Sequence, residues 1–137
     1  MNEFLEKTRI FEKGEITWWT CEDVKTNKHC LFVYGDNDIQ KGKGGQAIIR
    51  NFPNTIGIPT KKLPWQKPGA YYSDDEFHEN MQKITLALEK VIKKSRNYEI
   101  VYFPKDGLGT GLAHMEKECP LTFQALNKLL KPIYFKQ

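Results

Sequence analysis

Two glycine-rich segments, each directly after a short apolar run, constrain the fold of this chain more than any other feature. Cys30 to Tyr34 precedes the loop Gly35 to Gly45, and Glu99 to Phe103 leads into the loop Pro104 to His114. Short runs of β-branched and aromatic residues are typical of strands, and glycine allows backbone conformations that other residues rarely adopt. Both segments therefore predict a strand that ends in a tightly turned loop.

The rest of the sequence predicts strands that alternate with helices. We expect further strands at Ile16 to Cys21 and Asn54 to Pro59, a polar turn at Glu22 to Lys28, and a short helix at Gly45 to Phe52 that Pro53 ends. We also expect an ordered loop at Lys61 to Tyr72, a helix from Pro120 to Leu130 that Pro132 ends, and a short last strand at Ile133 to Phe135. Alternation of this kind indicates an α/β domain whose sheet is mixed but mostly parallel and lies between helices.

The most regular helix of the sequence follows Ser73-Asp74-Asp75-Glu76. This order is a capping box, in which the serine hydroxyl accepts from a free amide and Glu76 returns to the capping residue. Apolar residues then recur three or four positions apart through Val91, and lysines occupy the last turn, where the helix dipole favours cations.

Length and composition restrict the class of protein. A chain of 137 residues predicts a single domain over 1–137. No apolar run approaches the ~20 residues of a membrane span, and the first residues lack the apolar core of a signal peptide, so we expect a cytoplasmic protein that does not bind membranes. The cysteines, Cys21, Cys30 and Cys119, lack metal-ligand spacing and indicate buried thiols without a metal or other cofactor.

The two glycine-rich loops have the chemistry of anion sites. Ligands of parallel α/β sheets bind beyond the carboxyl ends of the strands, and this rule brings both loops and Thr60 to Tyr72 together. Glycines remove side chains from the backbone, so that consecutive amides can approach phosphate oxygens. A pair of tight turns without a ligand is the alternative interpretation.

Common phosphate motifs do not fit. The Walker motif GxxxxGK[ST] is absent. Gly42, Gly44 and Ala47 satisfy GxGxxG/A, but they start well after the strand and no acid follows at the ribose-binding distance.

Two stretches resemble macrodomain signatures. LFVYGDNDIQKGKGGQAIIR resembles the segment in which a strand ends near an asparagine and a glycine loop precedes a helix, and YFPKDGLGTGLA resembles the second glycine loop. With NTIGIPTK between them, the resemblance covers Leu31 to Leu130, and the whole chain looks like small macrodomain-like proteins of bacteria and their phages. It implies a three-layer macrodomain-like fold that binds ADP-ribose or a related phosphorylated nucleotide, free or attached to a macromolecule.

The resemblance also implies the residues of the site. Asn37 matches the asparagine near the distal ribose. The first loop supplies Gly42, Gly44, Gly45 and Gln46, and the second supplies the diphosphate loop Gly107, Leu108, Gly109, Thr110, Gly111 and Leu112. For Asn37, a turn residue with positive φ is the alternative.

Catalysis is implied less completely. Lys61 matches the lysine of macrodomains that resemble terminal ADP-ribose glycohydrolases, but Ala113 stands where those proteins carry an aspartate. Asp36, Asp106 and His114 flank the loops and are the groups that could move protons for the Lys61 amine. A solvated or phosphate-facing Lys61, and an Asp106 that caps its own loop, are the alternatives.

Three functions follow as hypotheses. The first is an enzyme that hydrolyses ADP-ribosyl linkages, and the second is a non-catalytic reader or a protein that sequesters a nucleotide signal. The third is a basic RNA-binding domain, because the net charge is +4. No acid marks an adenine site, since Cys30 lies at that position; Trp65, Tyr71 and Tyr72 would either stack on a base or pin their loop to the core.

Overall fold

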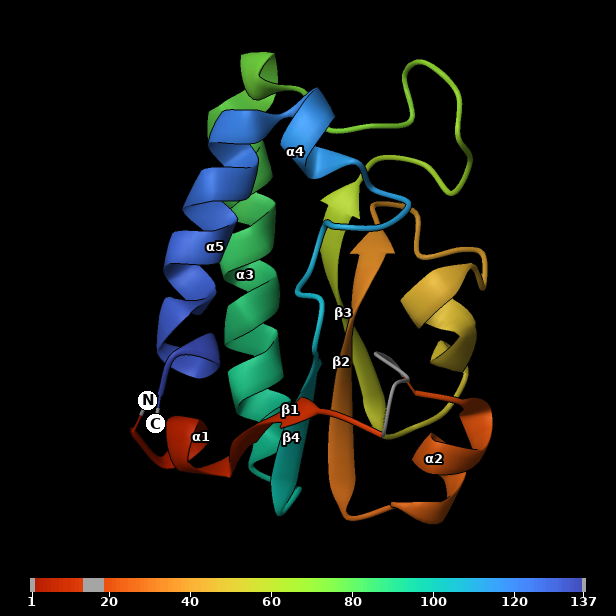
Figure 1. Ribbon diagram of the computed structural model, residues 1–137, viewed down its shortest axis with the longest axis vertical. Helices are drawn as coiled ribbons and strands as arrows, with labels where there is room; N and C mark the ends of the chain where they lie inside the picture. Colours follow the sequence, from red (N-terminus) through yellow and green to blue (C-terminus); the bar gives the residue numbers. More distant parts are fainter. Residues whose placement is uncertain (1, 14–18, 137) are drawn as a thin grey trace.

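The structure is a computed structural model that describes residues 2–13 and 19–136 (Figure 1). Its strands are β1 (Thr8–Phe11), β2 (Cys30–Asn37), β3 (Thr55–Lys61) and β4 (Ile100–Pro104). Its helices are α1 (Asn2–Lys7), α2 (Cys21–Thr26), α3 (Phe77–Ser95), α4 (Met115–Glu118) and α5 (Pro120–Tyr134), with the 3₁₀-helices η1 (Gly45–Ile49) and η2 (Asp74–Glu76).

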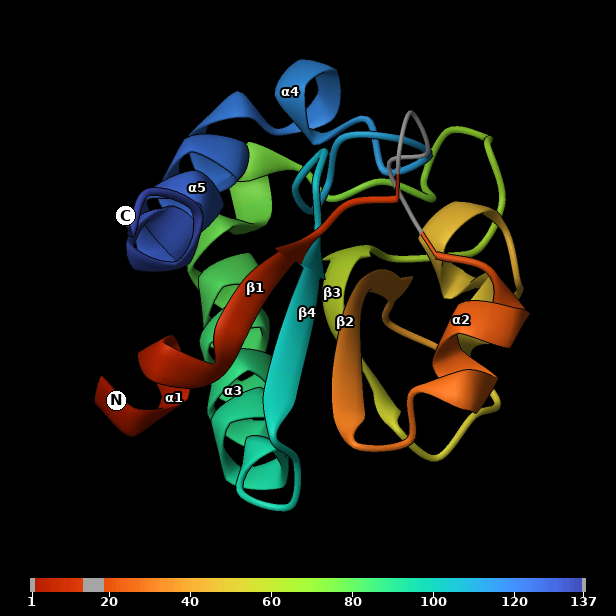
Figure 2. The same ribbon diagram turned by 60° about the horizontal axis from the view of Figure 1, so that its bottom comes forward.

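The strands form one parallel sheet in the order β1-β4-β2-β3. Helices α3 and α5 cover one face of this sheet, and α2 and η1 cover the other, as the two views in Figures 1 and 2 show. The α/β class and the mostly parallel sheet are confirmed. An antiparallel member, as a mixed sheet would require, is absent from the described strands.

Strand β2 is buried on both faces, which explains its uninterrupted apolar sequence. Leu31 and Val33 pack in the core beneath α3 and α5, whereas Phe32 and Tyr34 pack in a second core with α2 and η1. Trp19 belongs to this second core, where its ring lies 5.4 Å from that of Phe32 and its Nε1 donates to Gln46 O at 3.0 Å. The aromatic cluster therefore anchors the segment that carries the first glycine loop.

The predicted strands at 54–59 and 99–103 are confirmed as β3 and β4, and the predicted strand at 30–34 is longer at its carboxyl end. Strand β1 and helix α1 were not expected from their charged sequence. Tertiary pairing decides here, because β1 lies beside β4 in register from Thr8↔Val101 to Phe11↔Pro104.

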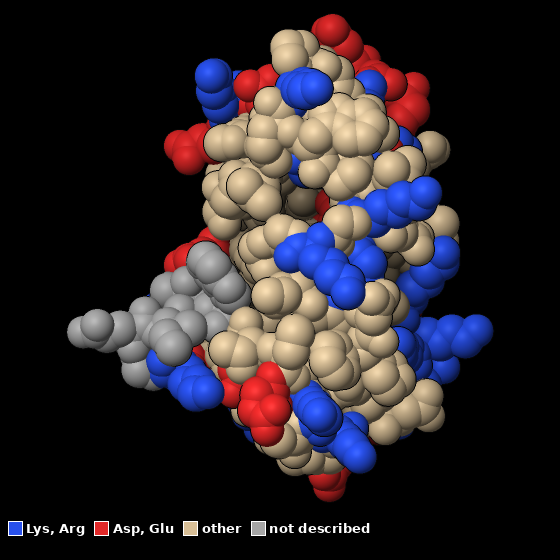
Figure 3. Space-filling view, turned by 90° about the vertical axis from the view of Figure 1, so that its right-hand side faces the viewer, with Lys and Arg blue, Asp and Glu red and all other residues tan. Residues whose placement is uncertain are grey.

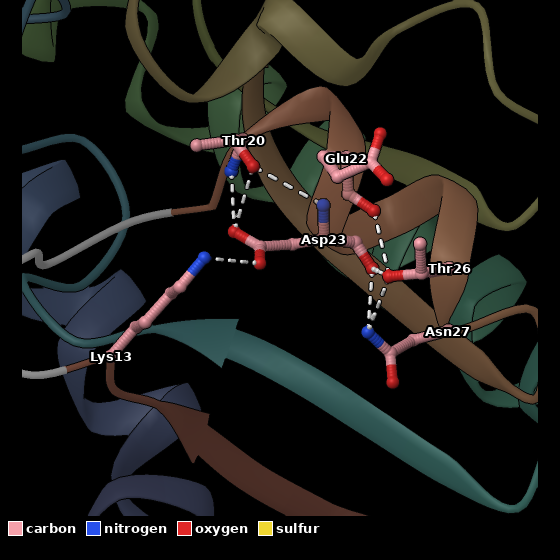
Figure 4. Close-up of polar contacts among 6 residues, drawn as sticks. All are labelled: Lys13, Thr20, Glu22, Asp23, Thr26 and Asn27. Atoms are coloured by element: carbon pink, nitrogen blue, oxygen red, sulfur yellow. Dashed lines mark hydrogen bonds and ion pairs between the residues drawn. The ribbon is translucent and has the colours of Figure 1, made fainter.

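Three predictions at the amino-terminal side of β2 and in η1 are corrected. The strand expected at Ile16 to Cys21 lies partly outside the described residues, and in its described part Trp19 and Thr20 are not in a strand and Cys21 begins α2. The turn expected at Glu22 to Lys28 is mostly helix, because Thr20 and Asp23 form a capping box at its start. In this box, Asp23 N donates to Thr20 Oγ1 at 3.2 Å and Thr20 N donates to Asp23 Oδ2 at 2.8 Å (Figure 4). The helix expected at Gly45 to Phe52 is the shorter 3₁₀-helix η1.

The carboxyl-terminal prediction is also wrong, since α5 continues through Pro132 to Tyr134 and no strand forms at 133–135. Ile133 is buried in the core and Tyr134 Oη donates to Pro104 O at 2.5 Å. These contacts hold the last turn although proline removes one helical hydrogen bond.

The capping box before α3 is confirmed in part. Ser73 accepts from Asp75 N at 3.2 Å, but Glu76 forms an ion pair with Lys62 instead of returning to Ser73. Asp74 caps α5, because its carboxylate accepts from Leu121 N and Thr122 N, each at 2.9 Å.

Within the described residues, no helix combines the length and the apolarity needed to cross a membrane. Cys30 and Cys119 are buried and Cys21 is partly exposed, and burial raises the pKa of the Cys119 thiol to about 12.

Replacing Thr20 with alanine is expected to lower the free energy of unfolding by about 1 kcal/mol, since Thr20→Ala removes the hydroxyl that caps α2. Urea denaturation measures this change. Thr26→Ala is the matched control, because the Thr26 hydroxyl donates back to Glu22 O and Asp23 O within the same helix, accepts from Asn27 Nδ2 at 3.3 Å and caps no amide of the first turn. Equal losses in the two variants would contradict the capping role.

Candidate functional site

The carboxyl ends of β2 and β4 separate, and a pocket of about 390 Å³ lies where they part. The two strands pair only from Cys30↔Ile100 to Phe32↔Tyr102. The chain leaves β2 toward η1 on one face and leaves β4 toward α4 and α5 on the other (Figure 2). Such a reversal at adjacent strands is where open α/β sheets bind ligands.

Most of the residues predicted for the site line this pocket. They are Asp36, Asn37, Gly42, Gly44, Gly45, Gln46, Lys61, Asp106, Gly109, Thr110, Gly111 and Leu112. Gly107 and Leu108 do not line it: Leu108 is fully buried in the core, and Gly107 O accepts from Gln46. His114, which the sequence analysis named as a possible proton carrier, also lines the pocket. Further lining residues that were not predicted to bind a ligand are Gly35, Lys41, Ala47, Thr60, Pro64, Gln66 and Ala113.

Three loops meet around the pocket at short distances. A Cβ added at Gly44 would lie 2.9 Å from Leu112 Cδ1, and one added at Gly42 would lie 3.2 Å from Pro64 Cβ. The first glycine loop therefore touches both the second glycine loop and the loop after β3. Figure 3 shows this side of the molecule, where a hollow opens among mainly uncharged atoms with lysine and arginine atoms beside it.

Gln46 joins the two glycine loops. Its Oε1 accepts from Gly35 N at 2.9 Å, at the end of β2, and its Nε2 donates to Gly107 O at 3.1 Å. One side chain thus replaces the strand pairing that β2 and β4 no longer make at this level. The predicted contact of Gln46 with a ligand stays a prediction, and its observed role is to join the two loops.

The second glycine loop presents consecutive backbone amides. The N–H groups of residues 108–113 donate to no acceptor among the residues that the structure describes. Leu108 and Gly109 are buried, and buried amides are nearly always hydrogen-bonded in proteins. Gly107 and Gly109 have φ of 84° and 80°, on either side of a residue with negative φ, which is the alternation that makes a nest of amides. Consecutive amides in this conformation have the geometry that can bind an anion.

The first glycine loop is fixed by Arg50, which the sequence did not single out. Arg50 Nε donates to Gly42 O at 2.8 Å, its Nη2 donates to Lys41 O at 3.1 Å, and Nη2 also lies 2.6 Å from Asp36 Oδ1. Both side chains of this ion pair are almost fully buried. Asp36 also accepts from Asn37 N at 2.7 Å. Asp36 therefore holds Arg50 and the loop in place, a geometry that does not leave it free to move protons.

Asn37 closes the same loop. Its Nδ2 donates to Lys41 O at 2.7 Å, and its Oδ1 accepts from Lys41 N at 3.4 Å. Positive φ in this loop falls on Gln40, Gly42 and Gly45, not on Asn37. Its predicted role at a ribose stays a prediction, and its observed role is to shape the pocket wall.

The Lys61 side chain is buried, and its ammonium group forms no ion pair with a carboxylate of the described residues. Its Nζ donates to Trp65 O at 2.9 Å and Leu112 O at 3.3 Å, and Gln66 Oε1 accepts from it at 2.9 Å when that amide is oriented to satisfy its neighbours. Nζ also lies 5.0 Å from the centre of the Tyr71 ring. Burial lowers the pKa of Lys61, because the neutral amine needs less solvation than the ammonium.

The other candidate proton carriers are at the mouth of the pocket. Asp106 and His114 are exposed, and His114 has a φ of 47° and lies 5.5 Å from the Tyr71 ring. Of the three aromatic residues considered for stacking, Tyr72 is buried and donates to Asp38 Oδ1 at 2.6 Å, so that it pins the loop to the core. Trp65 is 46% exposed beside Pro64 and Gln66. The described residues contain no group of His, Cys, Asp or Glu arranged to hold a metal ion.

The chain matches a protein family. A family model described as a family of unknown function, DUF7831, matches residues 15–129. The chain belongs to the DUF7831 family. No curated protein and no solved structure shows significant similarity to it. The matched range of this DUF7831 protein contains both glycine loops and Lys61.

Replacing Gly109 with alanine is expected to lower the free energy of unfolding by about 2 kcal/mol, because an L-residue is strained at its φ of 80° and the added Cβ would lie 2.2 Å from Met115 Sδ. Gly111→Ala is the matched control in the same loop, since its Cβ would meet no atom within 4 Å. Chemical denaturation of both variants gives the difference. A Gly111→Ala loss as large as that of Gly109→Ala would contradict this packing.

Proposed function

We propose that this DUF7831 protein binds ADP-ribose or a related phosphorylated nucleotide in the pocket between its glycine loops, as a macrodomain-like domain. The observation that carries the proposal is the run of unpaired amides at residues 108–113 beside a buried ammonium group that no carboxylate of the described residues neutralises. Both features supply positive electrostatic potential to the same pocket. A diphosphate would satisfy the amides and offset the charge of Lys61 without a metal ion.

The size of the pocket fits a ligand of this class. Sites for small molecules and cofactors have volumes of roughly 300–1,000 Å³, and this pocket has about 390 Å³. The backbone of the second glycine loop would contact the phosphates, because its glycines leave the amides uncovered. Trp65 and Leu112 are both about half exposed at the rim and offer apolar surface for the uncharged parts of a nucleotide.

A second candidate is hydrolysis of an ADP-ribosyl linkage, and the lowered pKa of Lys61 favours it. A larger neutral fraction makes an amine a better nucleophile. Asp36 is engaged by Arg50, however, and the exposed groups that remain near the mouth are Asp106 and His114. The binding function requires none of these groups to move a proton and is therefore the one that we put first.

Titration calorimetry with ADP-ribose tests the binding proposal. Gly111→Glu adds a carboxylate at a lining position where a Cβ meets no atom, so it should weaken binding at least about tenfold without unfolding the loop. Gln124→Glu adds the same charge at an exposed position of α5 and is the matched control, expected to bind like the unmodified protein. The proposal fails if the unmodified protein takes up neither ADP-ribose nor ADP, or if both variants bind equally well.

The pH dependence of binding tests the role of Lys61. Since burial lowers its pKa in the folded protein, the ammonium form is lost at a lower pH than for a solvated lysine, and affinity for a diphosphate should fall as pH rises through that lowered pKa. Lys61→Met should bind more weakly at neutral pH and show a flatter profile. A profile unchanged by Lys61→Met would show that the lysine charge does not act on the ligand.

A turnover assay separates the two candidates. Release of ADP-ribose from an ADP-ribosylated peptide or oligonucleotide, abolished in Lys61→Met while binding persists, would establish hydrolysis. Binding without any release by the unmodified protein would leave the reader or sequestering function.

A further inference from the structure

The rim of the pocket carries cations that no acid neutralises. Lys43 lies between the lining residues Gly42 and Gly44, and Lys67 follows the lining residue Gln66. Both lysines are exposed, and neither forms an ion pair with a residue that the structure describes. The charge at this rim therefore stays available to a partner.

The acids of the surrounding elements are paired elsewhere. Asp36 binds Arg50, Asp38 binds Lys83, and Glu76 binds Lys62. Asp106 is an exposed acid that lines the mouth without an ion pair among the described residues, and its neighbour Lys105 pairs with Glu12. Figure 3 shows basic side chains close to the hollow, and acidic atoms at the ends of this face, along its left edge and at the hollow itself.

An exposed aromatic ring lies in the same rim. Trp65 is 46% exposed and follows Pro64, whose Cβ would lie 3.2 Å from a Cβ at Gly42. The segment of Trp65 and Lys67 thus meets the segment of Lys43 at the pocket mouth. Lysines next to an exposed aromatic ring are the combination with which proteins hold single-stranded nucleic acids, by phosphate attraction and base stacking.

We infer that Lys43, Trp65 and Lys67, which we call the lysine rim, bind a single-stranded nucleic acid whose attached or terminal nucleotide group enters the pocket. The inference rests on the proposed function, since the pocket takes the nucleotide group and the rim takes the strand that carries it. Phosphates that follow the group out of the pocket would meet Lys43 and Lys67, and an unstacked base would meet Trp65. An acidic protein as carrier would use the lysines but would leave the ring of Trp65 without a function.

Fluorescence anisotropy with three labelled probes tests the inference. They are ADP-ribose, a short single-stranded DNA that carries one ADP-ribosyl group, and the same strand without it. The carrying strand should bind at least about tenfold more tightly than ADP-ribose at about 50 mM salt. This difference in affinity should shrink steeply toward 200 mM, because added salt makes the release of counterions from the strand less favourable.

Two variants locate the effect. The double variant Lys43→Gln/Lys67→Gln should reduce the slope of log affinity against log salt concentration for the carrying strand by about 1.4, the value for two phosphate contacts on a single strand. It should leave the affinity for ADP-ribose within about twofold. Trp65→Ala should lower the affinity for the carrying strand by about tenfold, because stacking of a base on the indole ring is lost. Lys117 is an exposed lysine of α4 that does not line the pocket. The control variant Lys117→Gln should therefore change neither the salt dependence nor the affinity for the carrying strand.

Each contrary result has a separate meaning. Equal affinities for ADP-ribose and the carrying strand would overturn the lysine rim while the proposed function stands. An acidic peptide that carries the ADP-ribosyl group and binds as tightly as the strand, without sensitivity to Trp65→Ala, would overturn the choice of nucleic acid. Failure of ADP-ribose and the carrying strand to bind at all would overturn both the proposed function and the inference.

Discussion

The structure of the site depends on one carboxamide. Gln46 accepts from Gly35 N and donates to Gly107 O, and so it spans the gap where β2 and β4 stop pairing. If the strands continued to pair, no pocket would exist between their ends; without a bridge, the N–H of Gly35 and the carbonyl of Gly107 would lose their partners in a partly buried place. The bridge therefore sets the spacing of both glycine loops at once.

The core behind the site supports this bridge. Trp19 donates to Gln46 O from within the aromatic cluster of the second core, so the backbone of Gln46 is fixed on one side while its side chain reaches across the other. Arg50, one turn later, binds Lys41 O, Gly42 O and Asp36. The 3₁₀-helix η1 and its C-cap residue thus supply both side chains that shape the first loop. Their donors and acceptors bind the protein, whereas the amides of residues 108–113 in the second loop have no acceptor among the described residues.

The sequence predicted residues that the fold brings together around one pocket. Glycine spacing after an apolar run identified both loops, and most of the predicted residues line the pocket. Asn37 and Gln46 were assigned to the ligand by their positions in the macrodomain resemblance, and in this structure their carboxamides bind Lys41 and the ends of the loops. A sequence shows which atoms can form hydrogen bonds, and only the fold decides whether a protein atom already occupies them. Arg50 was missed for the same reason, since nothing local distinguishes it from a solvated arginine.

The sequence by itself determined the α/β class, the strands β2, β3 and β4 of a mostly parallel sheet, the helix that α3 forms, and the two glycine loops. These features follow from local periodicity, caps and backbone freedom, which operate over a few residues. Only the tertiary structure decided that residues 8–11 form β1, that α5 passes through Pro132, and that Lys61 is buried among neutral oxygens instead of exposed. In each of these cases burial against distant residues outweighed the local preference, because pairing with β4, the packing of Ile133 and the closing of two loops over Lys61 are contacts between segments far apart in the sequence.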